Sequence, residues 1–353
     1  MVSNAAPDVP PHWLRAKRRC LAPVLHGAEE AALTRIVEGQ AGTQADSQFA
    51  NPFTLDDLLV LDETALHDIL DASGFGAETL ARGFHGASHQ LVQRVLQATP
   101  EEKRAALVAA LERRASAASI SQARHRILDA FFWELTYWKT PDLYEELTLG
   151  EPIHPGIFRR LAPDLRGHIV LDAGAGSGRA TFACLDRGAA RVYALEPSPG
   201  LLRILDRKRA DHPDGARILP LRGRFGAIPL ADDAVDVALS CSAFTSEPEH
   251  GGEPGLAELR RVTRTGGHIV LIWPRPEDYG WLAQHGFRYV ALPLHHEMRI
   301  RFRSLRSALR VVHRFYARNH TLARYLLQHR GAEVPYSLVG PNPPHDYCWL
   351  RVK

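Results

Sequence analysis

Residues 168–178 read His-Ile-Val-Leu-Asp-Ala-Gly-Ala-Gly-Ser-Gly, an apolar strand that leads into an acid and a glycine-rich turn. The three glycines lack the side chains that would keep the backbone away from a ligand, and they tolerate positive φ in a tight turn. Asp172 comes at the carboxyl end of the predicted strand, where open α/β sheets bind ligands. Glu196 closes a second apolar strand 18 residues after Gly178. This layout predicts a site for a nucleotide-type cofactor.

The positions of the glycines separate two cofactor classes. A dinucleotide fingerprint, Gly-x-Gly-x-x-Gly, requires glycine at position 179, which holds Arg179. A nicotinamide-dependent oxidoreductase is therefore disfavoured. The pattern acid-x-Gly-x-Gly-x-Gly resembles the first motif of the class I S-adenosylmethionine-dependent methyltransferases, in particular the type 11-like group.

This resemblance implies S-adenosylmethionine as the cofactor. It implies that the glycine turn wraps the methionine part, which Asp172 orients through the amino group or water. Glu196 falls where the second acid of the family accepts both ribose hydroxyls, a task that suits the two oxygens of a carboxylate. The predicted cofactor-binding residues are Asp172, Ala173, Gly174, Ala175, Gly176, Gly178, Glu196, Pro197, Arg224, Phe225 and Ser240.

The segment 223–240 resembles the family's adenine loop, Ile-Pro pair and fourth strand, with one departure. Many relatives place an Asp where this chain has Arg224, which offers donors and no acceptor. The adenine is then expected to be held by backbone groups and by stacking on Phe225. The residues 240–244, Ser-Cys-Ser-Ala-Phe, hold no planar acceptor for an amine, which argues against methylation of DNA-base amino groups.

The same family order continues to the end of the chain. A helical period at 256–262 leads to Gly266-Gly267 and a buried strand at 268–274, and further strands are predicted at 287–292 and 346–352. We therefore expect an α/β fold, a Rossmann-like class I methyltransferase sheet of seven strands over residues 151–353. A basic helical insertion is expected at about 299–330.

An all-α part is predicted to precede this sheet. Residues 1–50 are expected to be poorly structured or short-helical, and 51–150 to pack as helices with Thr54 and Asp62 as candidate caps. The leucine-rich opening before Leu61, the turn at 86–88 and a helix at 123–128 resemble the armadillo-like carboxyl-terminal region of the flagellar motor-switch protein FliG over residues 51–136.

The charges on which the torque function of that family rests are not kept in this chain. The corresponding positions are His85, Glu102, Ala109 and Ala110. A scaffold that docks a protein partner or self-associates is therefore the expectation, and a domain that merely caps the enzyme is the alternative.

Residues 131–138 carry five aromatics in eight positions. On a helix these rings cannot all face one side, so we expect a helix buried between the two parts. Stacking on nucleic acid is the less favoured alternative. Tyr144 falls in the region that caps the cofactor pocket in many small-molecule methyltransferases.

Composition limits the class of protein. The chain has 353 residues, 45% hydrophobic and 24% charged, which is ordinary for a soluble globular protein. We find no apolar run of membrane-spanning length and no signal-peptide pattern at the start. Cys20, Cys184, Cys241 and Cys348 lack the spacing of a zinc site or disulfide framework, so a cytoplasmic location is expected.

Charge is distributed unevenly. Residues 1–150 hold 14 basic and 20 acidic side chains, against 29 and 20 in the remainder. Residues 299–330 contain nine arginines and no acid. A helical period predicts one face formed by Arg303, Arg306, Arg310, Arg314 and Arg318. A solvated face is the first interpretation of this stripe; docking on the acidic half and contact with nucleic-acid phosphates are the alternatives.

The catalytic residues and the methyl acceptor are not assigned. Methyl transfer needs alignment above all, and a base only when a proton must leave. His250, Tyr279 and His285 are candidate bases, but spacing fixes no partner for them, and no metal site is predicted. Residues 342–345, Asn-Pro-Pro-His, stand in the wrong place for the motif of amino-group methyltransferases. The acceptor is a small molecule or a protein, and the alternative function is a cofactor-binding adaptor or pseudoenzyme.

Overall fold

The computed structural model describes residues 24–38, 49–340 and 342–353. Of the predicted segment 1–50, it therefore shows helix α1 (Val24–Val37) and the residues at its end, while the proline-rich start, Cys20 and the small polar stretch at 42–48 lie outside the described residues. No helix among the described residues has the length and apolar content needed to cross a membrane.

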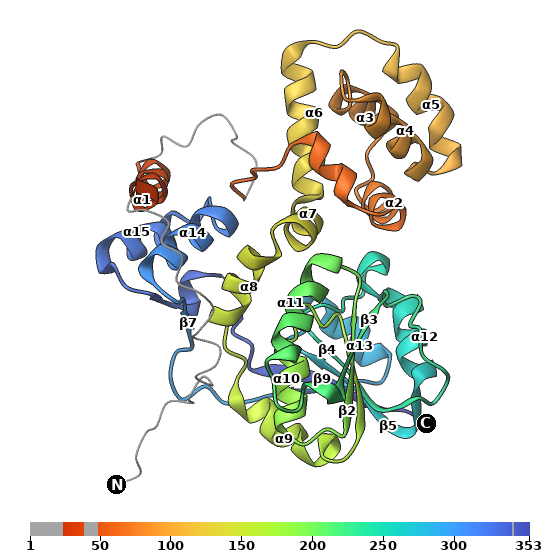
Figure 1. The fold of residues 1–353 in the computed structure, drawn as a ribbon, viewed down its shortest axis with the longest axis vertical. Helices are drawn as coiled ribbons and strands as arrows, with labels where there is room; N and C mark the ends of the chain where they lie inside the picture. Colours follow the sequence, from red (N-terminus) through yellow and green to blue (C-terminus); the bar gives the residue numbers. More distant parts are fainter. Residues whose placement is uncertain (1–23, 39–48, 341) are drawn as a thin grey trace.

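A seven-stranded sheet is the centre of the second half of the chain, in the order β3-β2-β1-β4-β5-β9-β6 (Figure 1). The first five strands along this order run parallel, and β9 is antiparallel to both of its neighbours. The strands predicted at 287–292 and 346–352 are β6 and β9. The bounds are β1 (Ile169–Ala173), β2 (Arg191–Glu196), β3 (Ile218–Arg222), β4 (Val235–Cys241), β5 (Thr263–Ile272), β6 (Arg288–Ala291) and β9 (Asp346–Arg351).

Alternate strand residues face two buried layers of helices, because the side-chain period of a strand is two. Val170 and Val237 pack with α9 and α10, whereas Leu171 and Ala238 pack with α12 and α13. Helix α11 lies against β2 and β3. The helices of this part are α9 (Pro155–Leu165), α10 (Arg179–Asp186), α11 (Pro199–Ala210), α12 (Gly252–Val262) and α13 (Tyr279–Gln284), with short turns η3 (Gly215–Arg217), η4 (Pro248–His250) and η5 (Pro276–Asp278).

The first half of the chain is helical, as predicted. Thr54 forms a capping box with Asp57, and the Asp62 side chain accepts from the Ala65 amide at 2.8 Å, so both predicted caps are confirmed. The helix predicted at 123–128 lies within a longer helix that ends at Ala130, where Phe131 separates it from the next helix. The elements are η2 (Leu55–Val60), α2 (Glu63–Ala72), α3 (Ala77–Gly83), α4 (His89–Ala98), α5 (Glu101–Leu111), α6 (Ala117–Ala130), α7 (Phe132–Lys139) and α8 (Pro141–Gly150).

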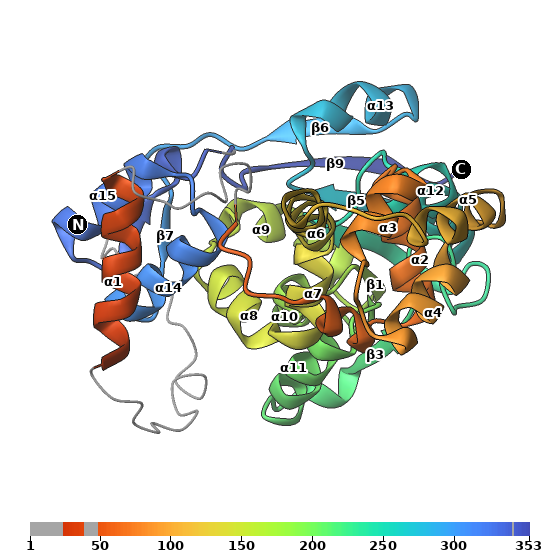
Figure 2. The same cartoon turned by 90° about the horizontal axis from the view of Figure 1, so that it is seen from above.

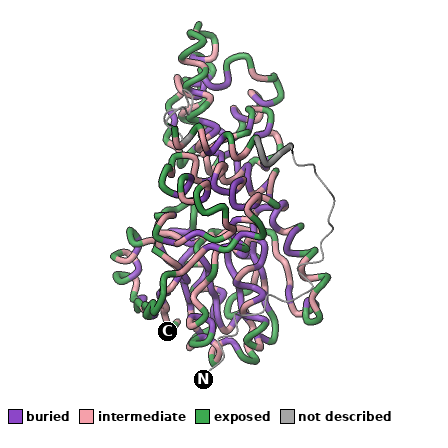
Figure 3. Tube along the Cα trace, turned by 90° about the vertical axis from the view of Figure 1, so that its left-hand side faces the viewer, coloured by how far each residue is buried: buried purple, intermediate pink, exposed green. Residues whose placement is uncertain are grey.

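Residues 299–339 leave the sheet and join the helices of the first half in one hydrophobic core. Leu33, Phe132, Val312 and Leu326 are all buried in this core. Figures 1 and 2 show α1 beside α14 and α15, on the other side of α7 and α8 from α2–α6. Buried stretches continue from the sheet into these helices (Figure 3). The elements are β7 (Arg299–Arg301), α14 (Leu305–Phe315), α15 (His320–His329), β8 (Glu333–Pro335) and η6 (Tyr336–Leu338).

The predicted single face of five arginines is wrong, because α14 includes three of them and Arg303 and Arg318 lie outside it. Arg310 pairs with Glu146, Arg314 donates to the carbonyl of Ala50, and Arg330 pairs with Glu30 at 2.6 Å. These contacts agree with docking of the basic segment on the acidic half of the chain, the alternative to a solvated stripe.

Helix α7 lies between the two parts, as its aromatic content predicts. Phe132 and Leu135 are fully buried, and the Trp133 ring stacks on Phe315 of α14 with centroids 5.3 Å apart. The end of α7 rests on the start of α11, where the Ser198 hydroxyl donates to the Tyr137 carbonyl at 2.9 Å and also caps α11. The interface is thus anchored at a helix start next to Glu196.

The end of α7 can approach α11 closely because residue 200 is a glycine. A methyl group at this position would fall on the Tyr137 carbonyl oxygen and 2.9 Å from that of Trp138. We expect Gly200→Ala to lower the free energy of unfolding by about 1–3 kcal/mol, the usual cost of overpacking, in chemical denaturation followed by circular dichroism. Gly280→Ala is the matched control, because nothing lies within 4 Å of its added methyl. Equal stability of the two variants would contradict this account of the interface.

Candidate functional site

The predicted glycine turn lies where the strand order of the sheet reverses. β1 pairs with β2 on one side and β4 on the other, so the helices that follow these strands diverge and leave a crevice at their carboxyl ends. Gly174, Gly176 and Gly178 leave β1 at this crevice with φ of 73°, 55° and 97°. All three are in the left-handed region, which glycine adopts without steric cost.

The three glycines of the turn have different structural roles. A methyl group on Gly174 would lie 2.6 Å from the Cβ of Ala243, and one on Gly178 would lie 2.5 Å from a methyl of Leu205. Both positions therefore require glycine for packing. At Gly176 the nearest atom is on the Tyr144 ring, 4.0 Å away, so this glycine faces open space beneath an aromatic side chain.

Asp172 is fully buried at the end of β1. Its Oδ2 accepts from the Thr181 hydroxyl at 2.5 Å, while its Oδ1 has no hydrogen-bond partner among the described residues. Burial raises the pKa of this carboxyl to about 6. A buried acceptor that lacks a partner fits the predicted role of binding an amino group or water beside the turn.

Glu196 is held directly against the turn. Its Oε2 accepts from the Gly176 amide and its Oε1 from the Ser198 amide, both at 2.9 Å. Burial raises the pKa of Glu196 to about 7. Since each carboxylate oxygen has two lone pairs, each can still accept a ribose hydroxyl, so the arrangement fits the predicted role.

A small, partly open cavity lies over the turn. It includes Asp172, Gly174, Ala175 and Gly176 from the predicted set, and Tyr144, which was expected to cap it. The predicted residues Ala173, Gly178, Glu196, Pro197, Arg224, Phe225 and Ser240 are not on its wall. Residues on the wall that were not predicted are Thr148, Ser177, Arg179, Ala180 and Cys241.

At the predicted adenine end, both Phe225 and Arg224 contact other parts of the protein. The Phe225 ring lies against the turn, 3.2 Å from where a methyl on Gly174 would be, and meets Phe244 edge-on. Arg224 pairs with Asp62 at 3.4 Å and with Asp68 at 3.3 Å. Helix α2 of the first half therefore contacts the loop that the resemblance assigns to the adenine.

Two further predicted residues lie near these elements. The hydroxyl of Ser240 is buried in β4 and has no hydrogen-bond partner among the described residues. Pro197 follows Glu196 in the bend before α11 and is half-buried.

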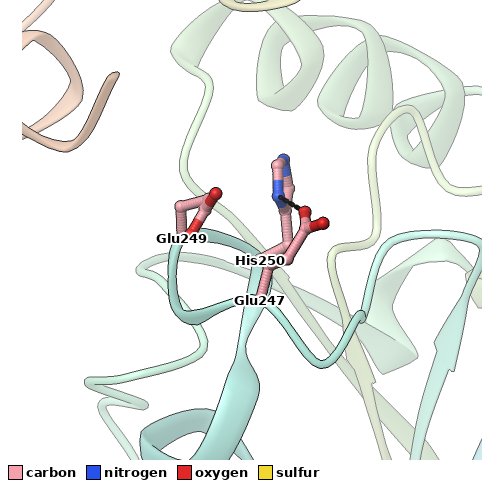
Figure 4. A group of neighbouring side chains, drawn as sticks. All are labelled: Glu247, Glu249 and His250. Carbon is pink, nitrogen blue, oxygen red and sulfur yellow. Dashed lines mark ion pairs between the residues drawn. The ribbon is translucent and has the colours of Figure 1, made fainter. Parts of the chain in front are cut away.

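The three candidate bases lie away from the cavity wall. The Tyr279 hydroxyl donates to Asp346 at 2.6 Å, and His285 pairs with Glu253 at 2.8 Å. His250 is exposed beside Glu247 and Glu249 (Figure 4), where the Glu247–His250 distance is 3.8 Å. These groups have partners of their own and form no part of the crevice.

From the sequence, Arg179 serves only as evidence against a dinucleotide-binding site, and no role in binding is predicted for it. In the structure it begins α10 and lies on the cavity wall, and its guanidinium contacts Glu151 and Ser242. Both Arg179 and Thr181 stand in the first turn of the helix that follows the glycine turn, and this position in the sequence could have drawn attention to them. Glu151 carries no such local signal, because it reaches the site only through tertiary packing.

Comparison with known proteins places the glycine turn in a recognised domain. Residues 170–267 match the family model of a methyltransferase domain. An uncharacterized methyltransferase of Mycobacterium tuberculosis is 38% identical over 120 residues, which cover 33% of this chain and 44% of that protein. One of Mycobacterium leprae is 31% identical over 176 residues, covering 42% and 60%. The chain thus spans less than half the length of the first relative. The match to the methyltransferase domain supports S-adenosylmethionine as the cofactor.

Solved structures also align with parts of the chain. The YcgJ protein of Bacillus subtilis covers 56% of this chain and 95% of its own, with 13% identity and a TM-score of 0.37. A SAM-dependent methyltransferase of Aquifex aeolicus covers 42% of this chain and 90% of its own, with 22% identity and a TM-score of 0.34.

The raised pKa of Glu196 makes cofactor affinity depend on pH. Ribose hydroxyls donate to the ionised carboxylate, so we expect affinity for S-adenosylmethionine to rise by up to about tenfold between about pH 6 and about pH 8. Calorimetric titration at each pH measures this change. Glu196→Gln should bind more weakly and with a flatter pH profile. An equally steep profile in that variant would remove Glu196 from the site.

Proposed function

We propose that this chain is an S-adenosylmethionine-dependent methyltransferase whose acceptor enters between the sheet and the helical segments. One observation carries the proposal: at the point where the strand order reverses, a turn of three positive-φ glycines lies beside a buried, partly unpaired Asp172 and is bonded to Glu196. Each of these features suits one part of the cofactor.

The proposed division of roles follows the crevice. Gly174, Gly176 and Asp172 would hold the methionine part, Glu196 the ribose, and Phe225 the adenine. When bound, the cofactor supplies a methyl group on a positively charged sulfur, which makes the methyl carbon electrophilic. The ring of Tyr144, which lies over Gly176, would exclude water from that end.

A second candidate function is a cofactor-binding adaptor that acts through its helical part. The observation that favours it is the contact of α2 with the adenine loop, in which Asp62 pairs with both Arg222, at 2.6 Å, and Arg224. Binding of adenine would then change the position of the helical part relative to the sheet. In this second proposal the helical part is a docking surface for a protein partner. The resemblance of residues 51–136 to FliG supports such a role.

Calorimetric titration with S-adenosylmethionine, S-adenosylhomocysteine and NAD tests the proposal. We expect the first two ligands to bind and NAD to give no heat. Gly176→Val should weaken binding by about 100-fold or more, because valine fills the space below Tyr144 and must adopt positive φ.

Gly280→Val is the control for that variant, since nothing lies within 4 Å of its Cβ. Retained affinity in Gly176→Val would refute the assigned turn, and failure of both methionine ligands to bind would refute the function. Binding without methyl transfer to any acceptor tried would favour the adaptor.

A further inference from the structure

Two side chains of opposite charge, Asp172 and Arg179, lie on the wall of the cavity over the glycine turn. Asp172 presents a buried oxygen, Oδ1, that has no hydrogen-bond partner among the described residues. Arg179 is the first residue of α10, and its Nη2 lies 3.9 Å from the Sγ of Cys241, which is also on the wall. The cavity is therefore bordered by a hydrogen-bond acceptor and, beside Cys241, by a cationic donor.

The contacts of the Arg179 guanidinium within the protein are long. Its Nη1 donates to the carbonyl oxygen and to the Oε2 of Glu151, each at 3.4 Å, and its Nη2 donates to the Ser242 hydroxyl at 3.2 Å. Close bonds between a guanidinium and a carboxylate are about 2.7–2.9 Å long. Arg261 makes such bonds, with its Nε and Nη2 2.6 Å and 2.8 Å from the two oxygens of Glu258. Arg179 and Glu151 therefore form a loose ion pair, unlike the pair within α12.

Burial makes a loose ion pair unfavourable at this place. The side chains of Arg179 and Glu151 are 21% and 11% exposed, so both charges have lost most of their contact with water. Such a loss is offset only when the opposite charge is close and the remaining donors are satisfied. A ligand that brings a second carboxylate to Arg179 would supply the missing bonds.

Glu151 connects Arg179 to the helical side of the cavity. It directly follows α8, the helix that carries Tyr144 and Thr148 on the cavity wall. The ion pair thus ties the end of α8 to the start of α10. A ligand that takes Arg179 from Glu151 would release this tie.

We infer that Arg179 binds the carboxylate of the methionine part of S-adenosylmethionine, and that it leaves Glu151 when it does so. This inference rests on the proposed methyltransferase function. The methionine part carries an ammonium group and a carboxylate on the same carbon atom, so its site needs an acceptor and a donor on one wall, as Asp172 and Arg179 provide. The planar guanidinium suits a carboxylate because it can donate two parallel bonds. Glu151 competes for the same guanidinium and so weakens binding of the cofactor.

Calorimetric titration of the full-length protein with two ligands tests the role of Arg179. S-adenosylhomocysteine has the amino-acid end, and 5′-methylthioadenosine lacks it. We expect Arg179→Met to weaken binding of S-adenosylhomocysteine by about tenfold to 100-fold, the loss of hydrogen bonds to a charged group, and to leave binding of methylthioadenosine unchanged. Arg179→Lys should lose less, because it keeps the charge but not the planar fork. Arg187→Met, exposed at the other end of α10, is the matched control and should keep wild-type affinity for both ligands.

The exchange of partners predicts a change of opposite sign in Glu151→Gln. Removal of the competing charge should tighten binding of S-adenosylhomocysteine by about threefold to tenfold and leave methylthioadenosine unaffected. The exposed Glu249→Gln is the control for this variant and should change neither affinity.

The two ligands also separate this inference from the proposed function. Equal losses for both ligands in Arg179→Met and Arg179→Lys would show a purely structural role of the arginine and overturn the inference, as would unchanged binding of S-adenosylhomocysteine. Unchanged or weaker binding of S-adenosylhomocysteine in Glu151→Gln would overturn the exchange of partners. If neither ligand binds the wild-type protein, the proposed function itself fails.

Discussion

The rest of the structure depends on the bond between the Glu196 carboxylate and the Gly176 amide. This bond joins the end of β2 to the turn that leaves β1, and the amides of Gly174 and Ala175 add two bonds to the Leu195 carbonyl. The turn can approach β2 so closely only because its glycines accept positive φ. Burial of the carboxylate is the cost of this arrangement, and a ligand that donates to it would offset that cost.

The helical segments contact residues that lie close to Glu196 and to the end of β3. Ser198, two positions after Glu196, caps α11 and donates to the last turn of α7. Arg222, the last residue of β3, and Arg224 pair with Asp62, the N-cap of α2. Both contacts lie at the ends of β2 and β3, where we propose that the ribose and the adenine bind. The helical part is therefore in contact with this end of the sheet through side-chain and backbone hydrogen bonds.

What could be predicted from the sequence was local. The strands are apolar runs, Ser198 and Asp62 stand before helical periods, and the acid and glycine spacing marks the turn. The predicted arginine-rich helix is longer than α14, which ends at Phe315. No glycine or proline follows Phe315 closely enough to show that the helix ends there.

Contacts between distant segments could not be predicted. The pair of Arg179 with Glu151 joins residues 28 positions apart, and the position of Tyr336 depends on how 299–339 pack on the helices. Spacing along the chain does not encode either contact. The resemblance of residues 51–136 to FliG stays a prediction.

The shared core of the first helices and residues 299–339 sets the order in which the molecule can be completed during synthesis. Helices α1 and α7 bury Leu33 and Phe132 against α14 and α15, which leave the ribosome only after most of the sheet. β9, the strand between β5 and β6, comes later still. The amino-terminal helices therefore cannot complete their core by themselves, and the growing chain carries exposed apolar surface until α14 and α15 are made.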